Sequence, residues 1–175
     1  GLDGNYNTFQ ETVTLNGTTA VALANTSAIA INKVQVLTAG SGLVNAGNVD
    51  IRTVSGSTVK CRIQSLAESS GESAEFVYTI PNGQYGLLQR FQVYARTSTG
   101  DIWVYLQTKN SSGVAIIKAV GQKALTTTGF STGDILVDFG RGLYIPQKTQ
   151  LSLIVDVSAG TPVASAVGEI ELYSL

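Results

Sequence analysis

Short segments in which apolar and polar residues alternate recur along this chain, and they constrain its fold more than any other feature. An alternation of this kind has the period of a β-strand, in which successive side chains point to opposite faces of the sheet. No window of the sequence keeps the helical spacing of apolar residues for more than two turns. The alternating segments cover residues 33–36, 49–53, 59–64, 75–80, 91–96, 102–107, 134–139, 151–157 and 169–173.

Glycine-containing turn signals separate these segments. Asn-Gly, Ser-Gly and Pro-Asn-Gly sequences favour tight turns because glycine adopts a positive φ at little cost. Such signals occur at residues 16–17, 55–56, 70–71, 81–83, 98–100, 111–113 and 140–142. Strands with one apolar and one polar face are typical of antiparallel sheets. The pattern therefore predicts an all-β protein of about ten strands, folded as an antiparallel two-sheet sandwich.

Two longer stretches favour Greek-key or jelly-roll connections over a simple meander. The first, Leu37 to Gly47, is rich in glycine, and the second, Gly121 to Gly133, is rich in threonine. The length of the chain favours one domain. We expect an N-terminal arm or loop at residues 1–10, which are rich in Asn and Gly, and a single β-sandwich domain over residues 11–175.

The composition argues against catalytic and metal chemistry. The chain has no His and one Cys, and its charged fraction is 13%, about half of what soluble proteins carry. Without His, a Ser-His-Asp triad is impossible and zinc loses its usual ligand. Cys61 lies between Val59 and Ile63 on one strand face, which predicts a buried core residue. We expect no enzyme activity, no catalytic residue, no bound cofactor and no metal ion.

Two sets of oxygen-bearing side chains allow alternatives. Glu169 and Glu171 stand two residues apart on one strand face, about 7 Å from each other by the rise of a strand. An inverting glycosidase could use that separation, but we expect both side chains to face solvent without a catalytic role. Neither candidate calcium cluster has the spacing of an EF-hand loop, so calcium is not expected. The clusters are Asp3, Asn5 and Asn7, and Asn45, Asn48 and Asp50.

The charge and hydropathy of the chain bear on its partners. It carries 11 basic and 12 acidic residues, a net charge of -1, whereas nucleic-acid-binding proteins normally have a basic excess. No stretch approaches 18 consecutive apolar residues, so we expect no membrane-spanning helix. The first residues lack the basic and then apolar layout of a signal peptide.

Aromatic and arginine side chains on two consecutive segments form the candidate binding patch. Trp103 and Tyr105 lie on the polar face of segment 102–107, and the preceding segment offers Tyr94 and Arg96. If the two strands pair, these four side chains form one patch that suits a sugar ring or a subunit contact. The alternative is that this face packs in a second layer or under a loop.

Three stretches of the sequence carry a resemblance. They are a glycine-rich loop leading into a strand (Thr38–Arg52), a Tyr-Thr-Ile-Pro-Asn-Gly-Gln-Tyr-Gly stretch (Tyr78–Gly86) and a Leu-Tyr-Ile-Pro stretch (Leu143–Pro146). In this pattern the chain resembles β-sandwich virion proteins of tailed phages, especially capsid-decoration, knob and fibre proteins of aquatic phages. The resemblance implies a jelly-roll-like sandwich that joins a virus particle, or virion, in the host cytoplasm. It carries no catalytic residues.

These observations together lead to two expectations for function. The first is a non-enzymatic virus particle structural protein whose partners are identical subunits or other virion proteins. Exposed edge strands normally carry protective charges, and this chain is poor in lysine, so we expect its edges to be covered by partners or loops. The alternative is a carbohydrate- or host-receptor-binding module on the same scaffold, with a host-surface glycan bound by the patch.

Overall fold

The computed structural model describes residues 1–39, 45–56, 58–65, 73, 76–97, 101–123, 131–158 and 163–175. Within these residues the protein has nine β-strands and no helix, and every pair of neighbouring strands is antiparallel. The prediction of an all-β protein with antiparallel sheets is confirmed. The strands are β1 (Val49–Arg52), β2 (Val59–Ile63), β3 (Val77–Thr79), β4 (Gln84–Thr97), β5 (Ile102–Lys109), β6 (Ala115–Lys123), β7 (Ser131–Ile145), β8 (Gln150–Val157) and β9 (Val163–Ser174).

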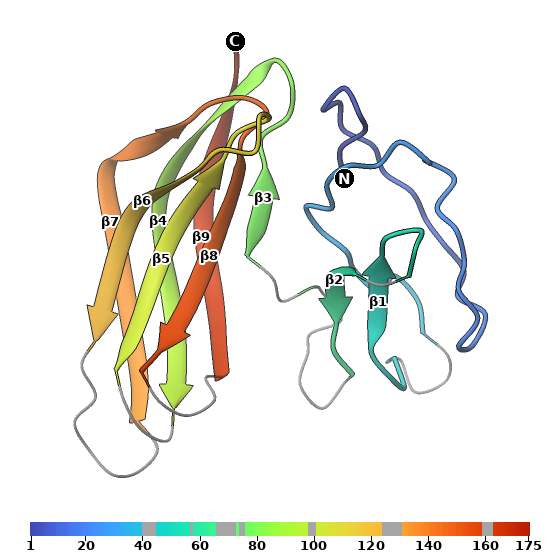
Figure 1. Cartoon of the computed structure of the whole chain (residues 1–175), viewed down its shortest axis with the longest axis horizontal. Coiled ribbons are helices and arrows are strands. Elements are labelled where there is room, and N and C mark those ends of the chain that lie inside the picture. The colour runs from blue at the N-terminus through green and yellow to red at the C-terminus, as the bar shows by residue number, and fades with distance from the viewer. Residues whose placement is uncertain are drawn as a thin grey trace.

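Two of the sheets share a core and form what we call the two-sheet body (Figure 1). One sheet has the strand order β3-β8-β5-β6 and the other β7-β4-β9. Strand β5 follows the predicted alternation, because buried and half-buried side chains alternate from Ile102 to Thr108. Burial of apolar side chains from both sheets contributes roughly 1.5–3 kcal/mol for each large side chain. The fully buried members include Leu88, Phe91, Val93, Ile102, Val104, Leu106, Ile145 and Leu151.

Residues 1–65 form a separate lobe beside the two-sheet body (Figure 1). It holds the β1-β2 sheet and long irregular segments, and the buried side chains among its described residues are Leu2, Cys61 and Ile63. The two-sheet body begins at β3, and neither β1 nor β2 pairs with its strands. The predicted arm at residues 1–10 is held in place, since the N–H of Leu2 donates to the carbonyl of Ala30 at 2.9 Å. Burial of Cys61 is confirmed.

The N-terminal lobe contacts the body at the edge strand β3. The side-chain amide of Asn32 donates to the carbonyl of Thr79 and accepts its N–H, both at 2.9 Å. These are the two bonds that a neighbouring strand would make, so Asn32 covers part of the open edge of β3. A second contact joins the N–H of Asn82 to the carbonyl of Tyr6 at 2.9 Å.

Several details of the predicted strand pattern are wrong. Segment 33–36 is not a strand, and β6 lies where no alternation was found. The expected loop from Gly121 to Gly133 contributes its ends to β6 and β7, while residues 124–130 lie outside the described residues. Residues 140–142 form a bulge inside β7 and not a turn between strands. The expected turns at 70–71 and 98–100 and residues 40–44 of the expected loop from Leu37 to Gly47 also lie outside the described residues.

Candidate functional site: the outer face of the β7-β4-β9 sheet

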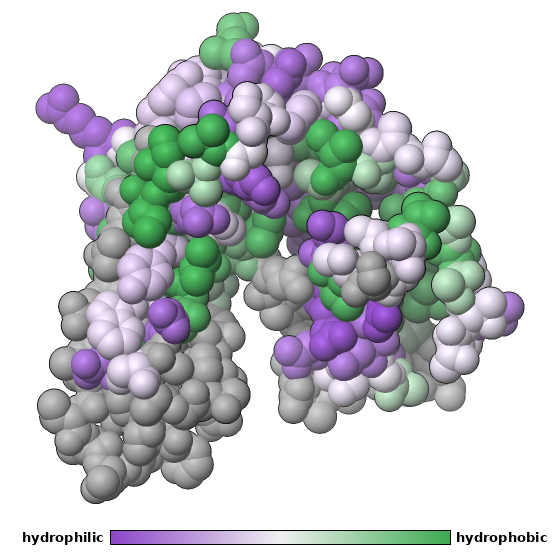
Figure 2. Space-filling model, viewed as in Figure 1, coloured by the Kyte–Doolittle hydropathy of each residue, from purple (hydrophilic) through white to green (hydrophobic). Residues whose placement is uncertain are grey.

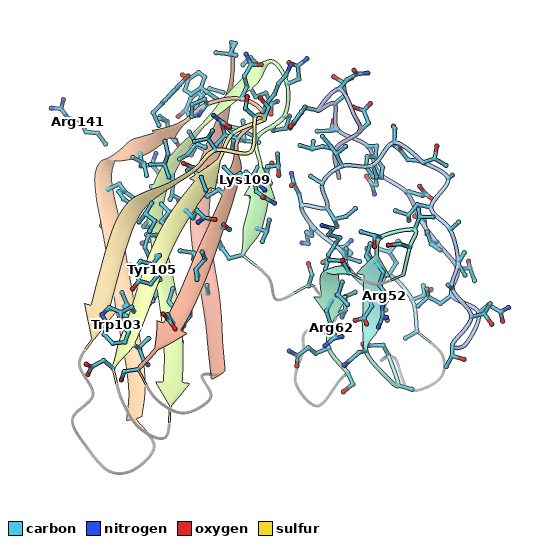
Figure 3. The ribbon with its side chains drawn as sticks, in the orientation of Figure 1. Arg52, Arg62, Trp103, Tyr105, Lys109 and Arg141 are labelled. Atoms are coloured by element: carbon cyan, nitrogen blue, oxygen red, sulfur yellow. The ribbon has the colours of Figure 1, made fainter. Side chains whose placement is uncertain are left out.

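The structure separates the residues of the predicted binding patch. Strands β4 and β5 belong to different sheets, so the pairing on which the patch depended does not occur. Trp103 and Tyr105 lie half-buried on the outer face of β5, one after the other along the strand (Figure 3). Tyr94 alternates with buried Val93 and is exposed on the outer face of the opposite sheet. The side chain of Arg96 lies outside the described residues.

The outer surface of the four-stranded sheet is mixed in polarity. Tyr105 lies opposite Ile154 of β8, and Trp103 lies opposite Asp156. Apolar side chains lie over β6 and β8 in Figure 2. On this face Ile117 lies opposite Gln107, and both Ile117 and Ile154 are exposed. This surface presents aromatic rings beside polar groups.

The other sheet carries a larger set of exposed and half-buried large side chains, which we call the outer aromatic face. The residues of this face alternate along their strands with residues of the core, so their side chains point away from the core. Leu136 and Val167 lie on either side of Gln92 and are 57% and 66% exposed. Soluble monomers seldom expose large contiguous apolar patches unless the patch binds something. The members are Tyr85, Tyr94, Leu136, Tyr144, Val167 and Tyr173.

Three of these residues form a ladder of rings across the sheet. Tyr85 of β4 lies between Tyr144 of β7 and Tyr173 of β9, with ring centroids 5.5 and 5.3 Å away. The Tyr85 and Tyr173 rings are stacked with 16° between their planes. Aromatic pairs across neighbouring strands stabilise a sheet by about 0.5–1.5 kcal/mol beyond the area they bury. Because Tyr85 has a ring on each side, the ladder offers ring edges and hydroxyl groups more than open ring faces.

Charged side chains on this face already pair with one another. Arg90 and Glu169 form an ion pair at 2.9 Å. Glu171 accepts hydrogen bonds from the Tyr173 hydroxyl at 2.6 Å and from Gln89 Nε2 at 3.2 Å. The Glu171 carboxylate raises the pKa of Tyr173, because an ionised phenol would lose this hydrogen bond and meet a negative charge. Both glutamates are exposed, so the prediction that they face solvent is confirmed.

A bulge in β7 borders the outer aromatic face. Leu143 pairs with Leu88 and Asp138 pairs with Arg90, so residues 139–142 lie opposite Gln89. Gly140 and Gly142 have φ values of 61° and 84°, which glycine adopts without strain. Arg141, between them, projects away from the body (Figure 3). Bulges re-aim side chains at sheet edges, and here the result is an exposed cation beside the face.

The residues of the candidate calcium clusters have structural roles. Asp3 Oδ1 accepts the backbone N–H groups of Asn5 and Asn7 at 2.8 and 2.9 Å, closing a turn. Asn48 Oδ1 accepts the N–H of Ser65, and Asn45 Nδ2 donates to backbone carbonyls. Among the described residues, no group of three His, Cys, Asp or Glu side chains is placed to hold a metal ion.

Asp50 organises the β1-β2 sheet by binding two arginines, Arg52 and Arg62, both of which are labelled in Figure 3. Its Oδ1 is 2.6 Å from Arg62 Nε and its Oδ2 is 2.6 Å from the Arg52 guanidinium. These hydrogen bonds, Arg62 first, hold the pKa of Asp50 well below its usual range. Charge-assisted pairing therefore joins neighbouring strands in a lobe that has little buried apolar surface.

The lowered pKa of Asp50 gives a pH-dependent stability. The contribution is fully present above the pKa of an unfolded aspartate, about 3.9, and is lost as the pH falls through the lower folded value. We expect hydrogen-exchange protection of the β1 and β2 amides to fall between about pH 4 and pH 2. Asp50→Asn should reduce protection above pH 4 and abolish this pH dependence. Asp138→Asn, which lies in the body, serves as the control, and an unchanged pH profile in Asp50→Asn would contradict the prediction.

Comparisons with known proteins return nothing, since no protein-family model, curated protein or solved structure matches this chain. Among the described residues, no helix is long and apolar enough to cross a membrane. The functional inference therefore rests on the surface of the molecule itself. Sequence reasoning missed the tyrosine ladder, although Tyr144 occupies an outward position between half-buried Leu143 and buried Ile145.

Proposed function

We propose that this protein is a non-enzymatic structural component of a virus particle, of the capsid-decoration, knob or fibre type. It acts by packing against identical subunits or other virion proteins. The observation that carries the proposal is the outer aromatic face, on which the tyrosine ladder and the exposed Leu136 and Val167 lie on either side of the paired charged residues. The virion setting comes from the resemblance of three sequence stretches, Thr38–Arg52, Tyr78–Gly86 and Leu143–Pro146, to virion proteins of tailed phages.

The composition of this face suits a protein partner. Tyrosine and arginine are enriched at interface cores, and lysine is depleted there. Arg90, Glu169 and Glu171 already have partners within the face. Burying a charge that keeps its partner costs less than burying an isolated one. The face can thus lose its water on assembly without leaving these charges unpaired.

The proposal includes a sandwich fold of the jelly-roll or Greek-key type. Two facing antiparallel sheets with a common core support it. From β3 to β9, consecutive strands alternate between the two sheets except for the β5-β6 hairpin. Such crossings bind the layers together, which suits a rigid building block.

Two measurements test the proposal. Light scattering coupled to size exclusion gives the solution mass of the purified chain, and we expect a stable oligomer. Peptide mass spectrometry of purified virus particles from the source of the sequence should detect the chain at a fixed copy number. A monomer that is also absent from such particles would contradict the proposal.

A glycan-binding function is the second candidate, and the placement of Trp103 and Tyr105 on one outer face favours it. If a host-surface glycan binds there, Trp103→Ala should weaken binding about tenfold, since one ring stack contributes about 1 kcal/mol or more. Tyr94→Ala is the matched control, because Tyr94 lies on the opposite outer face. A glycan array measures both variants. Equal binding by the two variants, or no binding by the unmodified chain, would exclude this candidate.

A further inference from the structure

Residues 12–32 have an unusual composition for an exposed segment. No charged residue occurs between Glu11 and Lys33, and apolar residues alternate with polar or small ones in three short runs. Natural proteins place charges or prolines on exposed segments of this pattern, which otherwise pair with other chains. The alternating apolar residues are Val13, Leu15, Val21, Leu23, Ile29 and Ile31.

The first part of this segment, residues 11–25, forms an open hairpin that we call the uncharged hairpin. Its tip is the Asn16-Gly17 turn, closed by a bond from the N–H of Thr19 to the carbonyl of Asn16 at 3.0 Å. At its base, Glu11 accepts the N–H groups of Ala24 and Asn25 at 2.6 and 3.2 Å. Between these ends, residues 12–15 and 20–23 make no backbone–backbone hydrogen bond with any described residue.

The arms of the uncharged hairpin are therefore held near each other but not joined into a ladder. Leu15 and Val21 are 56% and 43% exposed. In Figure 1 the hairpin forms the margin of the N-terminal lobe farthest from the two-sheet body. Its free backbone groups and apolar side chains can thus be covered by another molecule more readily than by the body of its own chain.

The same chain carries a sheet edge that complements the hairpin. Among the edge strands of the two-sheet body, β3 is covered in part by Asn32, while β6 and β7 are interrupted by bulges. Strand β9 is the long edge that remains, and it pairs with β4 on one side only. Its charged residues are Glu169 and Glu171, both toward its C-terminal half. Because the uncharged hairpin carries no acidic residue between Glu11 and its end at residue 25, its strands would not be repelled by these two glutamates.

We propose that the uncharged hairpin of one copy adds as a strand to the β9 edge of a second copy. Addition of a strand to a sheet edge is an established mode of recognition in which main-chain hydrogen bonds supply the affinity. The donor and acceptor are different surfaces of one chain, so the contact is heterologous and closes into a ring or continues into a filament. This inference deepens the proposed function and rests on its self-assembly.

Paired substitutions on the two faces of the hairpin test the proposal. Leu15→Asp with Val21→Asp puts charges on the apolar face, and Thr14→Asp with Ala20→Asp puts the same number on the other exposed face. Light scattering should show an assembly larger than a dimer for the unmodified chain and the control. The apolar-face variant should lose at least half of that mass. Retention of the full mass by this variant would overturn the proposal.

Disulfide trapping identifies the strand that receives the hairpin. Chains with Leu15→Cys and one tag are mixed with chains of another tag that carry Cys at Val167, Glu169 or Glu171. We expect oxidised dimers that contain both tags, with a preference for one of the three positions. A separate sample contains chains with Leu136→Cys, which report on contact through the outer aromatic face. If only these chains form oxidised dimers, the hairpin contact is wrong while self-assembly through the outer aromatic face stands. A monomeric unmodified chain would instead contradict the self-assembly on which both rest.

Discussion

Gly168→Ala is expected to destabilise the two-sheet body by about 3 kcal/mol, at the upper end of what overpacking normally costs. A Cβ atom at Gly168 would overlap Cε2 and Cζ of the Phe76 ring. Phe76 cannot easily move, because its carbonyl accepts the N–H of Leu153 at 3.2 Å and its ring packs on the core. Urea unfolding followed by the fluorescence of Trp103 measures the change in the free energy of unfolding.

A matched glycine and a double-mutant cycle separate this clash from a general effect of alanine. Gly47 has open space around its Cβ position and no positive φ, so Gly47→Ala should change stability by no more than about 0.5 kcal/mol. Phe76→Ala removes the ring, and the double variant should be more stable than the sum of the two single effects. Strict additivity, or a small effect of Gly168→Ala alone, would show that the ring does not press on Gly168.

This packing contact illustrates what the sequence could not disclose. Phe76 and Gly168 are far apart in the sequence. Phe76 directly precedes β3 of one sheet, whereas Gly168 belongs to β9 of the other sheet. Alternation predicts that Phe76 points inward, but it does not say which residue the ring meets. The glycine is explained only when the two sheets are placed face to face.

Strands with two clearly different faces were predictable, and β5 is the best example. Its buried residues repeat every second position from Ile102, as the period of a strand requires. Strand β6 was missed because Ile116 and Ile117 are adjacent, and a register shift opposite Leu106 and Gln107 breaks the alternation. Segment 33–36 failed in the opposite way, since it alternates but belongs to none of the nine strands, and among the described residues its backbone contact is the bond from the N–H of Ser73 to the carbonyl of Val34. Pairing decides whether an alternating segment becomes a strand.

The candidate site depended on the arrangement of strands and was therefore the least predictable part. Consecutive strands are often neighbours in a sheet, which made a patch across β4 and β5 reasonable. Here the chain crosses between sheets after β4, so Tyr94 and Trp103 lie on opposite faces. The tyrosine ladder joins β4 to β7 and β9, and it follows from a register that local sequence does not encode.

Leu136→Asp combined with Val167→Asp is expected to weaken self-association at least about 100-fold in Kd. Both side chains flank Gln92 on the outer aromatic face and are more than half exposed. Exposed substitutions of this kind change monomer stability by only about 0.5 kcal/mol. On assembly, however, each carboxylate would lose water without gaining a partner. A loss of about 1.4 kcal/mol for each charge corresponds to the expected hundredfold change.

Sedimentation velocity over a series of concentrations measures this change, with a matched variant on the other sheet as the control. Ile117→Asp with Ile154→Asp introduces the same charges on the outer face of β6 and β8, because Ile117 lies opposite Gln107 and Ile154 opposite Tyr105, and both side chains are also exposed. If the outer aromatic face is the subunit contact, only the Leu136 and Val167 variant dissociates at concentrations where the unmodified chain stays assembled. Dissociation of the control alone would move the contact to the four-stranded sheet, where Trp103 and Tyr105 would then lie in the interface and not in a glycan site.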